Sequence, residues 1–525
     1  MKDIFRPERA IRVWCSAVGA TLFGMALAGL LITSPARAQE PHRGGSLTVA
    51  LRLTVASLDP LFGNAPGTDR KVYNLFAENL LVQDEAGKFH PVLAESWDIQ
   101  DDGRSIVFHL RHGVKFQDGT PFDAAAVKFN LDRLLDPSVN APSKQYVADL
   151  ESVDVMDSHT VRVRLKHKSG VMLAMLAVEP GSMLSPAAIQ SKGADFARSP
   201  VGTGPFKIVS WSGNQIVAER NPDYWRKDEK GQALPYLDRV TIKVIPNSAI
   251  RIIELKSGNS QLADYLDTKN FAQIEDSPAL RLESGTTAVD QLLAFNTTQP
   301  PFDNIELRKA VALAVNRKAL AQVITRGAGT PLNSLEPPST WVHDKEIRGH
   351  EFNVAEAREH YKRSGFQGAV TLSVIQRDPD TQVAQLIQSM LKQAGIEVKL
   401  EMMERQAWLS KVLSHKYELG LLQLGILRSD PDVTYSDFFG QSAARNYSGV
   451  DTSAKLAPMV AAARAESDTD KRRAIYSELQ QSVLDDYLLS PLFWLPIREG
   501  ASRKLQGFRR EASTSWFYDS MWLQP

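Results

Sequence analysis

Three consecutive segments decide the fold of this chain: "AVTLSVIQ" (369–376), "TQVAQLIQSMLKQAG" (381–395) and "IEVKLEMM" (396–403). The first is an apolar strand-like run, and the last alternates strictly between apolar and polar residues. The middle segment has the apolar spacing of a helix and ends at a glycine. A strand, a helix and a strand in this order form a β-α-β crossover with parallel strands and a right-handed connection. With a further strand at "YELGLLQLGI" (417–426), the sequence predicts an α/β domain.

The rest of the chain divides into two halves that differ in their predicted secondary structure. Before about residue 300, short strand-like runs such as "SIVFHLRHGVKF" (105–116) alternate with turns, and a helix is predicted at 123–135 with Asp123 as its N-cap. After it the helices lengthen, and "DNIELRKAVALAVNRKALAQVI" (303–324) is predicted to be a single helix. The proline-rich "TTQPPF" (297–302) marks the expected boundary between the halves.

The first 38 residues have the pattern of an export signal. A basic start precedes an uncharged stretch from Val13 to Ala36, and Ala36-Arg37-Ala38 forms a cleavage site. A membrane anchor is the alternative, but glycines and a proline interrupt the apolar stretch. Cleavage would remove Cys15, the only cysteine, which excludes disulfides and thiolate metal sites in the mature chain. The chain has 61 basic and 61 acidic residues, and this balance predicts no nucleic-acid-binding face.

Motifs for catalysis or phosphate binding are weak. The loop "SPVGTGPFKIVSW" (199–211) is glycine-rich, but Pro205 removes a donor and a strand follows, so a structural turn is the better interpretation. "HEFNV" (350–354) lacks the second histidine of the helical zinc motif, and "SDPD" (429–432) is ordinary turn chemistry. The sequence predicts no catalytic residue, no metal site and no cofactor.

One group of residues indicates a ligand site. Arg377 directly follows the strand 369–376, and Leu427-Arg428-Ser429-Asp430 follows the strand 417–426. If both strands belong to one sheet, these residues face the same crevice, where a guanidinium offers a bidentate fork to a carboxylate. The alternative is a solvated loop arginine, or one paired with Asp378 or Asp430. The candidate residues here are Arg377, Gly425, Leu427, Arg428 and Asp430.

Over essentially the whole mature length, the chain resembles family 5 of the solute-binding proteins of ABC importers, the dipeptide, oligopeptide, nickel and opine class. The match includes the "QAGIEVKL" unit and the "DPD…YSDFF" loop. The other matching stretches, in order, are "GGSLTVAL" (44–51), "SLDPLF" (57–62), 91–134, "TGPFKIVSW" (203–211), "ERNPDYW" (219–225) and 293–320.

The resemblance implies a two-lobed periplasmic-binding-protein type II fold, with three domains of mixed sheets flanked by helices. The chain would cross between the lobes near "LLAFNTT" (292–298) and "LSPLFWLP" (489–496). The implied boundaries are a signal at 1–38, a first domain at 39–78, 200–295 and 495–525, a second domain inserted at 79–199, and a third domain at 296–494.

The function implied is that of a periplasmic receptor and not an enzyme. It would capture a small organic solute, such as a peptide or another carboxylate, between its lobes and deliver it to an inner-membrane ABC permease. We expect a monomer without cofactor. A sensor or chaperone-like binder of the same fold, and an exported hydrolase with an unrecognised site, are the alternatives.

The resemblance also suggests roles for single residues. Dipeptide-binding members resemble this chain at Arg377, where an arginine holds the peptide carboxylate, but their aspartate for the α-amino group falls on Leu427. Asp430 is a candidate substitute. The departure favours an amine-blocked or modified peptide, a glutathione-like compound, an opine or another acidic metabolite over ordinary dipeptides and tripeptides, and no histidine suggests nickel binding. Predicted cleft walls, each with a core or rim position as the alternative, are Phe62, Asn64, Trp341 and Trp408.

Overall fold

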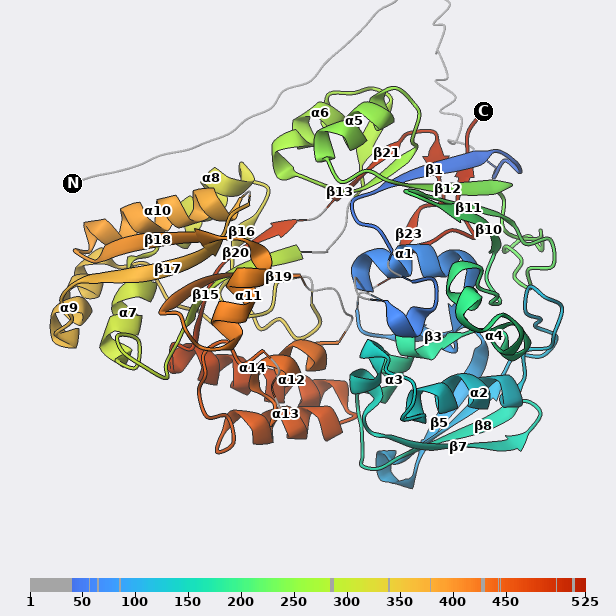
Figure 1. The fold of residues 1–525 in the computed structure, drawn as a ribbon, viewed down its shortest axis with the longest axis horizontal. Coiled ribbons are helices and arrows are strands. Elements are labelled where there is room, and N and C mark those ends of the chain that lie inside the picture. The colour runs from blue at the N-terminus through green and yellow to red at the C-terminus, as the bar shows by residue number, and fades with distance from the viewer. Residues whose placement is uncertain are drawn as a thin grey trace, which may run out of the picture. The chain divides into compact units, whose positions relative to one another are not determined.

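The computed structural model describes residues 40–525, except 56, 64–65, 85, 284–287, 339, 378, 426–429, 442, 444, 497 and 512–514. The predicted export signal and Cys15 lie outside these residues. The described residues form three sheets of four or more strands, with helices packed on them (Figure 1). Among the described helices, none is both long enough and apolar enough to cross a membrane.

A seven-stranded sheet combines segments from the start, the middle and the end of the chain. Its strands, in spatial order, are β10 (Phe206–Ser212), β11 (Gln215–Arg220), β12 (Arg239–Val244), β1 (Ser46–Leu51), β13 (Leu262–Leu266), β21 (Arg498–Ser502) and β14 (Leu280–Leu282). β1 is parallel to both of its neighbours, and the other pairs are antiparallel. Its apolar side chains pack against those of α1 (Pro66–Phe76), α5 (Ser248–Lys256) and α6 (Phe271–Glu275).

A four-stranded antiparallel sheet forms the centre of a second body. Its order is β5 (Ala94–Gln100), β6 (Ser105–Leu110), β8 (Thr160–Leu165) and β7 (Leu150–Asp157). The helix α2 (Ala124–Leu135) covers it, and the predicted cap is confirmed, because the Asp123 side chain accepts a hydrogen bond from the Ala126 backbone N–H. Smaller elements nearby are α3 (Met172–Leu176), α4 (Pro186–Lys192), and the ribbons β2 (Glu78–Asn79) with β9 (Ser182–Met183) and β3 (Leu81–Gln83) with β4 (Phe89–Pro91).

The third sheet has six strands and contains the predicted crossover. Its order is β16 (Thr330–Pro331), β20 (Leu489–Pro496), β15 (Ala288–Phe295), β19 (Leu419–Gly425), β17 (Ala369–Ile375) and β18 (Glu397–Met403). β17 is parallel to both β18 and β19, and α10 (Asp380–Gln393) connects β17 to β18, so the predicted β-α-β unit is confirmed. β15 is antiparallel to β19 and β20.

Helices cover both faces of this sheet with separate apolar cores. On one face lie α7 (Ile305–Ala314), α8 (Arg317–Thr325), α9 (Val354–Ser364) and α10. On the other lie α11 (Arg405–Leu413), α12 (Asp432–Phe439), α13 (Leu456–Ala465) and α14 (Thr469–Asp485). The prediction of a single helix over 303–324 is wrong: Val315 is extended, and the Asn316 side chain accepts the Ala319 N–H to start a new helix. Asparagine is favoured at the N-cap of a helix and disfavoured in its interior.

Short elements complete the described chain. These are the 3₁₀ turns η1 (Pro60–Phe62), η2 (Asp101–Gly103), η3 (Pro142–Val147), η4 (Glu179–Gly181), η5 (Gly193–Arg198) and η6 (Thr268–Asn270), and the ribbons β22 (Leu505–Gln506) with β25 (Trp522–Leu523) and β23 (Arg509–Arg510) with β24 (Trp516–Phe517).

The chain changes from one large sheet to the other at two points. It leaves the seven-stranded sheet after β14 and enters the six-stranded sheet at β15, and it returns between β20 and β21. The predicted boundary at 295/296 falls at the end of β15, although all of β15 pairs in the six-stranded sheet. The predicted boundary at 494/495 falls inside β20. The domain limits themselves stay predictions.

The glycine-rich loop at 199–211 leads into β10 and not into a helix. Its glycines allow close packing: a Cβ on Gly204 would lie 2.6 Å from the carbonyl carbon of Phe76, and a Cβ on Gly202 would lie 2.2 Å from the Phe76 oxygen. The Gly204 N–H donates to that oxygen at 2.8 Å. The loop is therefore a structural contact with the end of α1, where a side chain does not fit.

We expect Gly204→Ala to lower the free energy of unfolding by about 2 kcal/mol, the usual cost of forcing extra volume into a packed site. The midpoint of urea unfolding measures this loss. Ser210→Ala is the control, because Ser210 is exposed on β10. Equal midpoints for Gly204→Ala and the wild type would contradict the close packing described here.

Candidate ligand-binding site

The carboxyl ends of two parallel strands meet at one edge of the six-stranded sheet. In the register of β17 and β19, Leu372 lies opposite Leu419 and Ser373 opposite Gly420. Arg377 follows β17 directly, and the segment before Asp430 follows β19. Both segments therefore leave the sheet at the same edge, where ligands of open α/β sheets usually bind.

The Arg377 guanidinium is held in place by a buried carboxylate. Its Nε donates to Asp380 Oδ2 at 2.7 Å, and Asp380 Oδ1 accepts from Gln291 Nε2 at 2.8 Å. Asp380 and Gln291 are buried, whereas the Arg377 side chain is 36% exposed. Within the described part of the chain, its two terminal nitrogens make no further ion pair, so they remain available to a carboxylate. Arg377 thus pairs with Asp380, and not with Asp430, which was one of the predicted alternatives.

Asp430 is fully engaged by another arginine. Its two oxygens accept from both terminal nitrogens of Arg472 at 2.6 Å, and the two side chains are 1% and 6% exposed. The Asp432 N–H donates to the same carboxylate at 2.9 Å. A bidentate pair of this kind neutralises Asp430. Its predicted role as a partner for a ligand amine remains untested, and this pairing does not favour it.

The other predicted residues lie in different surroundings. The Trp408 ring is buried in the core, and its indole N–H donates to the Ser373 carbonyl at 3.1 Å. Trp341 is half-buried and packs edge-on against Tyr476. Phe62 is exposed at the end of η1. Gly425 is the last residue of β19, and Asn64, Leu427 and Arg428 lie outside the described residues. As ligand contacts, all of these stay predictions.

A buried acidic group on β15 was missed by the sequence analysis. Asp290 is 1% exposed, and neither carboxylate oxygen has a hydrogen-bond partner among the described residues. Burial and the charge of Glu336 raise the pKa of Asp290 well above its ordinary value. The only sequence signal was an aspartate inside the apolar strand "AVDQLLAF" (288–295). An unpaired buried carboxylate is unusual enough to require an explanation.

Glu336 is the second missed acid. Its side chain is buried, and burial raises its pKa to about 7, although Thr340 and Tyr435 act in the opposite direction. The negative charge of Asp430 raises it further. Burial, Glu336 and Asp290 together raise the pKa of the Tyr435 hydroxyl. The three side chains therefore form one electrostatic cluster, and perturbed pKa values of this kind are common at functional sites.

Contacts across the two lobes involve Arg464, which also pairs with Asp432, three residues before Tyr435. Arg464 on α13 donates to Asp149 at 2.9 Å and lies 3.4 Å from Asp432. The Gly170 N–H donates to the Arg464 carbonyl at 2.7 Å. Asp149 and Gly170 flank strands of the four-stranded sheet, whereas Arg464 belongs to the helices of the six-stranded sheet. These bonds join the two bodies directly.

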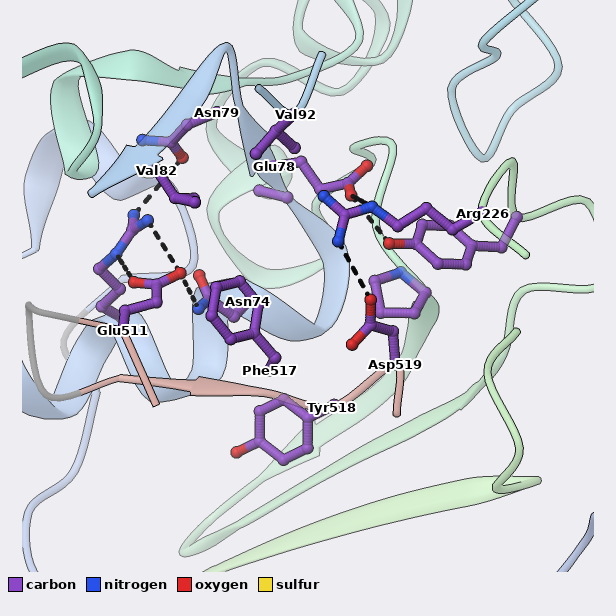
Figure 2. A pocket seen from close by; sticks show the side chains of 14 residues that line it. Asn74, Glu78, Asn79, Val82, Val92, Arg226, Glu511, Phe517, Tyr518 and Asp519 are labelled. Carbon is purple, nitrogen blue, oxygen red and sulfur yellow. Dashed lines mark hydrogen bonds and ion pairs between the residues drawn. The ribbon is translucent and has the colours of Figure 1, made fainter. Parts of the chain in front are cut away.

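A polar cavity, drawn in Figure 2, contains three carboxylates that each pair with an arginine. Arg70 pairs with Glu511 at 2.7 Å, and Arg226 lies between Glu78 and Asp519 (Figure 2). Arg509 is a second partner of Asp519. The space open to the centre of a water molecule is about 30 Å³, which suits one or two waters. This cavity fastens the end of the chain to α1 and is too small for a solute.

No group of three or more histidine, cysteine or acidic side chains arranged for a metal ion is present in the part of the chain that the structure describes.

Comparisons with known proteins define the class first. The ABC transporter-associated periplasmic binding protein DppA from Helicobacter pylori, in complex with the peptide STSA, superposes with a TM-score of 0.76 at 25% identity, covering 92% of this chain and 99% of that chain. AgaA from A. tumefaciens R10, in complex with agropinic acid, gives a TM-score of 0.75 at 25% identity over 92% and 99%. Both are periplasmic binding proteins by name, and the predicted type II fold is confirmed.

The chain belongs to the bacterial extracellular solute-binding proteins, family 5, whose model of the middle region matches residues 88–446. The glutathione-binding protein GsiB of Salmonella paratyphi A is 28% identical over 521 residues, which cover 96% of this chain and 98% of the relative. The family resemblance is therefore confirmed, and so is the predicted function as a solute-binding receptor of an ABC importer.

Glu336 should make the stability of the ligand-free protein depend on pH. Its pKa is about 7 in the folded state, against an ordinary value of 4.5, so the folded state binds the proton more tightly. Its contribution to stability is present below about pH 4.5 and is lost as the pH rises to 7 and above, by about 2–3 kcal/mol between pH 5 and 8. Urea unfolding at the two pH values measures this loss.

Glu336→Gln should reduce that dependence by the contribution of Glu336, since the amide does not titrate, while Asp290 and Asp432, whose pKa values burial also raises, keep theirs. The control is Glu346→Gln, because Glu346 is exposed a few residues further along. A wild-type slope in Glu336→Gln would contradict the assignment.

Proposed function

We propose that this protein is a periplasmic receptor for a peptide-like solute that carries a carboxylate, which Arg377 binds. The observation that carries the proposal is the fixed guanidinium at the ligand edge of the sheet, held through Nε by Asp380 with its terminal nitrogens available. A side chain that is fixed before the ligand arrives loses little conformational entropy on binding. The fork geometry matches a carboxylate.

The names of the relatives support the chemical class. GsiB is named for glutathione, the DppA structure holds a peptide and the AgaA structure holds agropinic acid. All three compounds carry at least one carboxylate. Because GsiB aligns with nearly the full length of this chain, glutathione and related peptides are the first solutes to test.

The proposed mechanism is closure of two lobes around the solute, without chemical change. The solute shifts the equilibrium toward the closed form only by its differential affinity for that form. The Asp149–Arg464 pair joins the two bodies and supports such a form. In this proposal the closed receptor, exported as a monomer to the periplasm, delivers the solute to an inner-membrane permease.

Arg377→Ala should weaken binding of a carboxylate solute at least tenfold, about 1.4 kcal/mol, because a charge-assisted bidentate contact is lost. Mass spectrometry of whatever leaves the freshly denatured wild type identifies the solute, and calorimetry then compares the variants. Arg239→Ala is the control, because Arg239 forms a half-exposed surface pair with Glu219. Unchanged affinity in Arg377→Ala would contradict the assignment, and a chemically altered solute after incubation would favour the hydrolase alternative.

Asp149→Asn should weaken solute binding about three- to tenfold, because it removes the charged partner of Arg464 across the lobes and leaves the Arg464–Asp432 pair in place. Titration followed by tryptophan fluorescence measures both affinity and closure. Asp154→Asn is the matched control, since Asp154 forms an exposed pair with Arg164 on the same strand region. Equal effects of the two variants would argue against a role for the contact in closure.

A further inference from the structure

The interior next to β15 contains, among the described residues, more acidic than basic side chains. Among the described residues, Arg472 is committed to Asp430, and Arg464 is shared between Asp149 and Asp432. Within the described part of the chain, Asp290 and Glu336, which interact electrostatically with each other, have no basic partner. In the cavity of Figure 2, by contrast, Arg70 pairs with Glu511, and Arg226 lies between Glu78 and Asp519. Carboxylates without a basic partner are thus not a general feature of the polar interior that the structure describes.

The surroundings of Asp290 suit a positively charged group. In the antiparallel register, Asp290 lies directly opposite Trp494 on β20 and Leu424 on β19, so the three side chains share one face of the sheet. Tyr435 reaches the same place from α12. The indole N–H groups of Trp341 and Trp494 have no partner among the described residues. Carboxylates bordered by aromatic rings bind ammonium groups through charge and through the faces of the rings.

We propose that Asp290, supported by Glu336, binds a cationic group of the solute, such as a primary ammonium. This inference rests on the proposed function, because it assigns a second contact to the same solute whose carboxylate meets Arg377. Among the described residues, neither buried oxygen of Asp290 has a donor, and an ammonium supplies up to three. The arriving cation would supply a counter-charge to the ionised carboxylate, which is costly to bury alone.

A purely structural role fits the contacts less well. A buried aspartate that stabilises the fold is expected to accept hydrogen bonds, as Asp430 does from Arg472 and from the Asp432 N–H. Asp290 accepts none within the described residues. The two aspartates lie in the same region and have the same burial, so they form a matched pair for the experiment.

The binding experiment uses glutathione and tri-alanine, each with a free and with an acetylated amino group. Wild type is expected to bind the free form at least tenfold more tightly than the acetylated form. Asp290→Asn should lose this preference and keep the wild-type affinity for the acetylated form. Arg377→Ala should weaken both forms alike and retain the preference, which separates the two contacts. No preference in wild type, or a full preference in Asp290→Asn, would overturn the proposal.

Thermal unfolding of the ligand-free protein gives an independent result. Asp290→Asn should leave Tm unchanged or raise it, whereas Asp430→Asn should lower it by at least about 4 °C because its ion pair is lost. A comparable fall in Asp290→Asn would show a structural role and overturn the proposal. If wild type binds neither form of either probe, the proposed peptide function is contradicted for these solutes, and the thermal comparison still decides the role of Asp290.

Discussion

The buried ion pair between Asp430 and Arg472 is the constraint on which the ligand side of the structure depends. It ties α14 to the start of α12 with two short hydrogen bonds in a place from which water is excluded. Breaking a buried pair by removing one partner usually costs several kcal/mol. The Arg472 guanidinium is fully engaged, because it donates to Asp430, to the Ala463 carbonyl and to the Tyr476 hydroxyl, and it does not pair with Glu336. The pair that secures the fold thus supplies no counter-charge to Asp290 and Glu336, which have no other basic partner among the described residues.

The cavity around Arg70 and Arg226 and the buried acids beside β15 differ in how their charges are paired. Full pairing stabilises the fold, whereas an unpaired group is available to a ligand. Around Arg70 and Arg226 every carboxylate meets an arginine, and Arg226 partly offsets the rise that burial causes in the pKa of Glu78. Such a site is complete without a solute. Beside β15, Asp290 and Glu336 have no basic partner among the described residues, and their burial costs stability in the ligand-free protein. Proteins commonly accept such a cost only where a ligand relieves it.

Local patterns in the sequence were sufficient to predict the strands and the helix that position the site, but not the pairing of its charged side chains. The β-α-β unit and the shared edge of β17 and β19 follow from apolar spacing over short stretches, and they place Arg377 correctly at that edge. The break between α7 and α8 depends on the cap at Asn316, which a long apolar pattern hides. The partners of Asp430 and Asp149 lie 42 and 315 residues away, so only the folded chain reveals them. The sequence shows Asp290 as a single acid in an apolar strand, but it does not show that both carboxylate oxygens lack a hydrogen-bond partner among the described residues.

The position of Asp290 links the proposed cation contact to lobe closure. Asp290 is the third residue of β15, just after the chain arrives from the seven-stranded sheet, and its neighbour Trp494 lies near the end of β20, just before the chain returns. A solute bound to both therefore touches the two strands that continue into the connections between the lobes. In the proposed closure the lobes turn about these connections, so contacts at this point distinguish one arrangement of the lobes from another. Differential affinity of that kind is what a closing receptor requires.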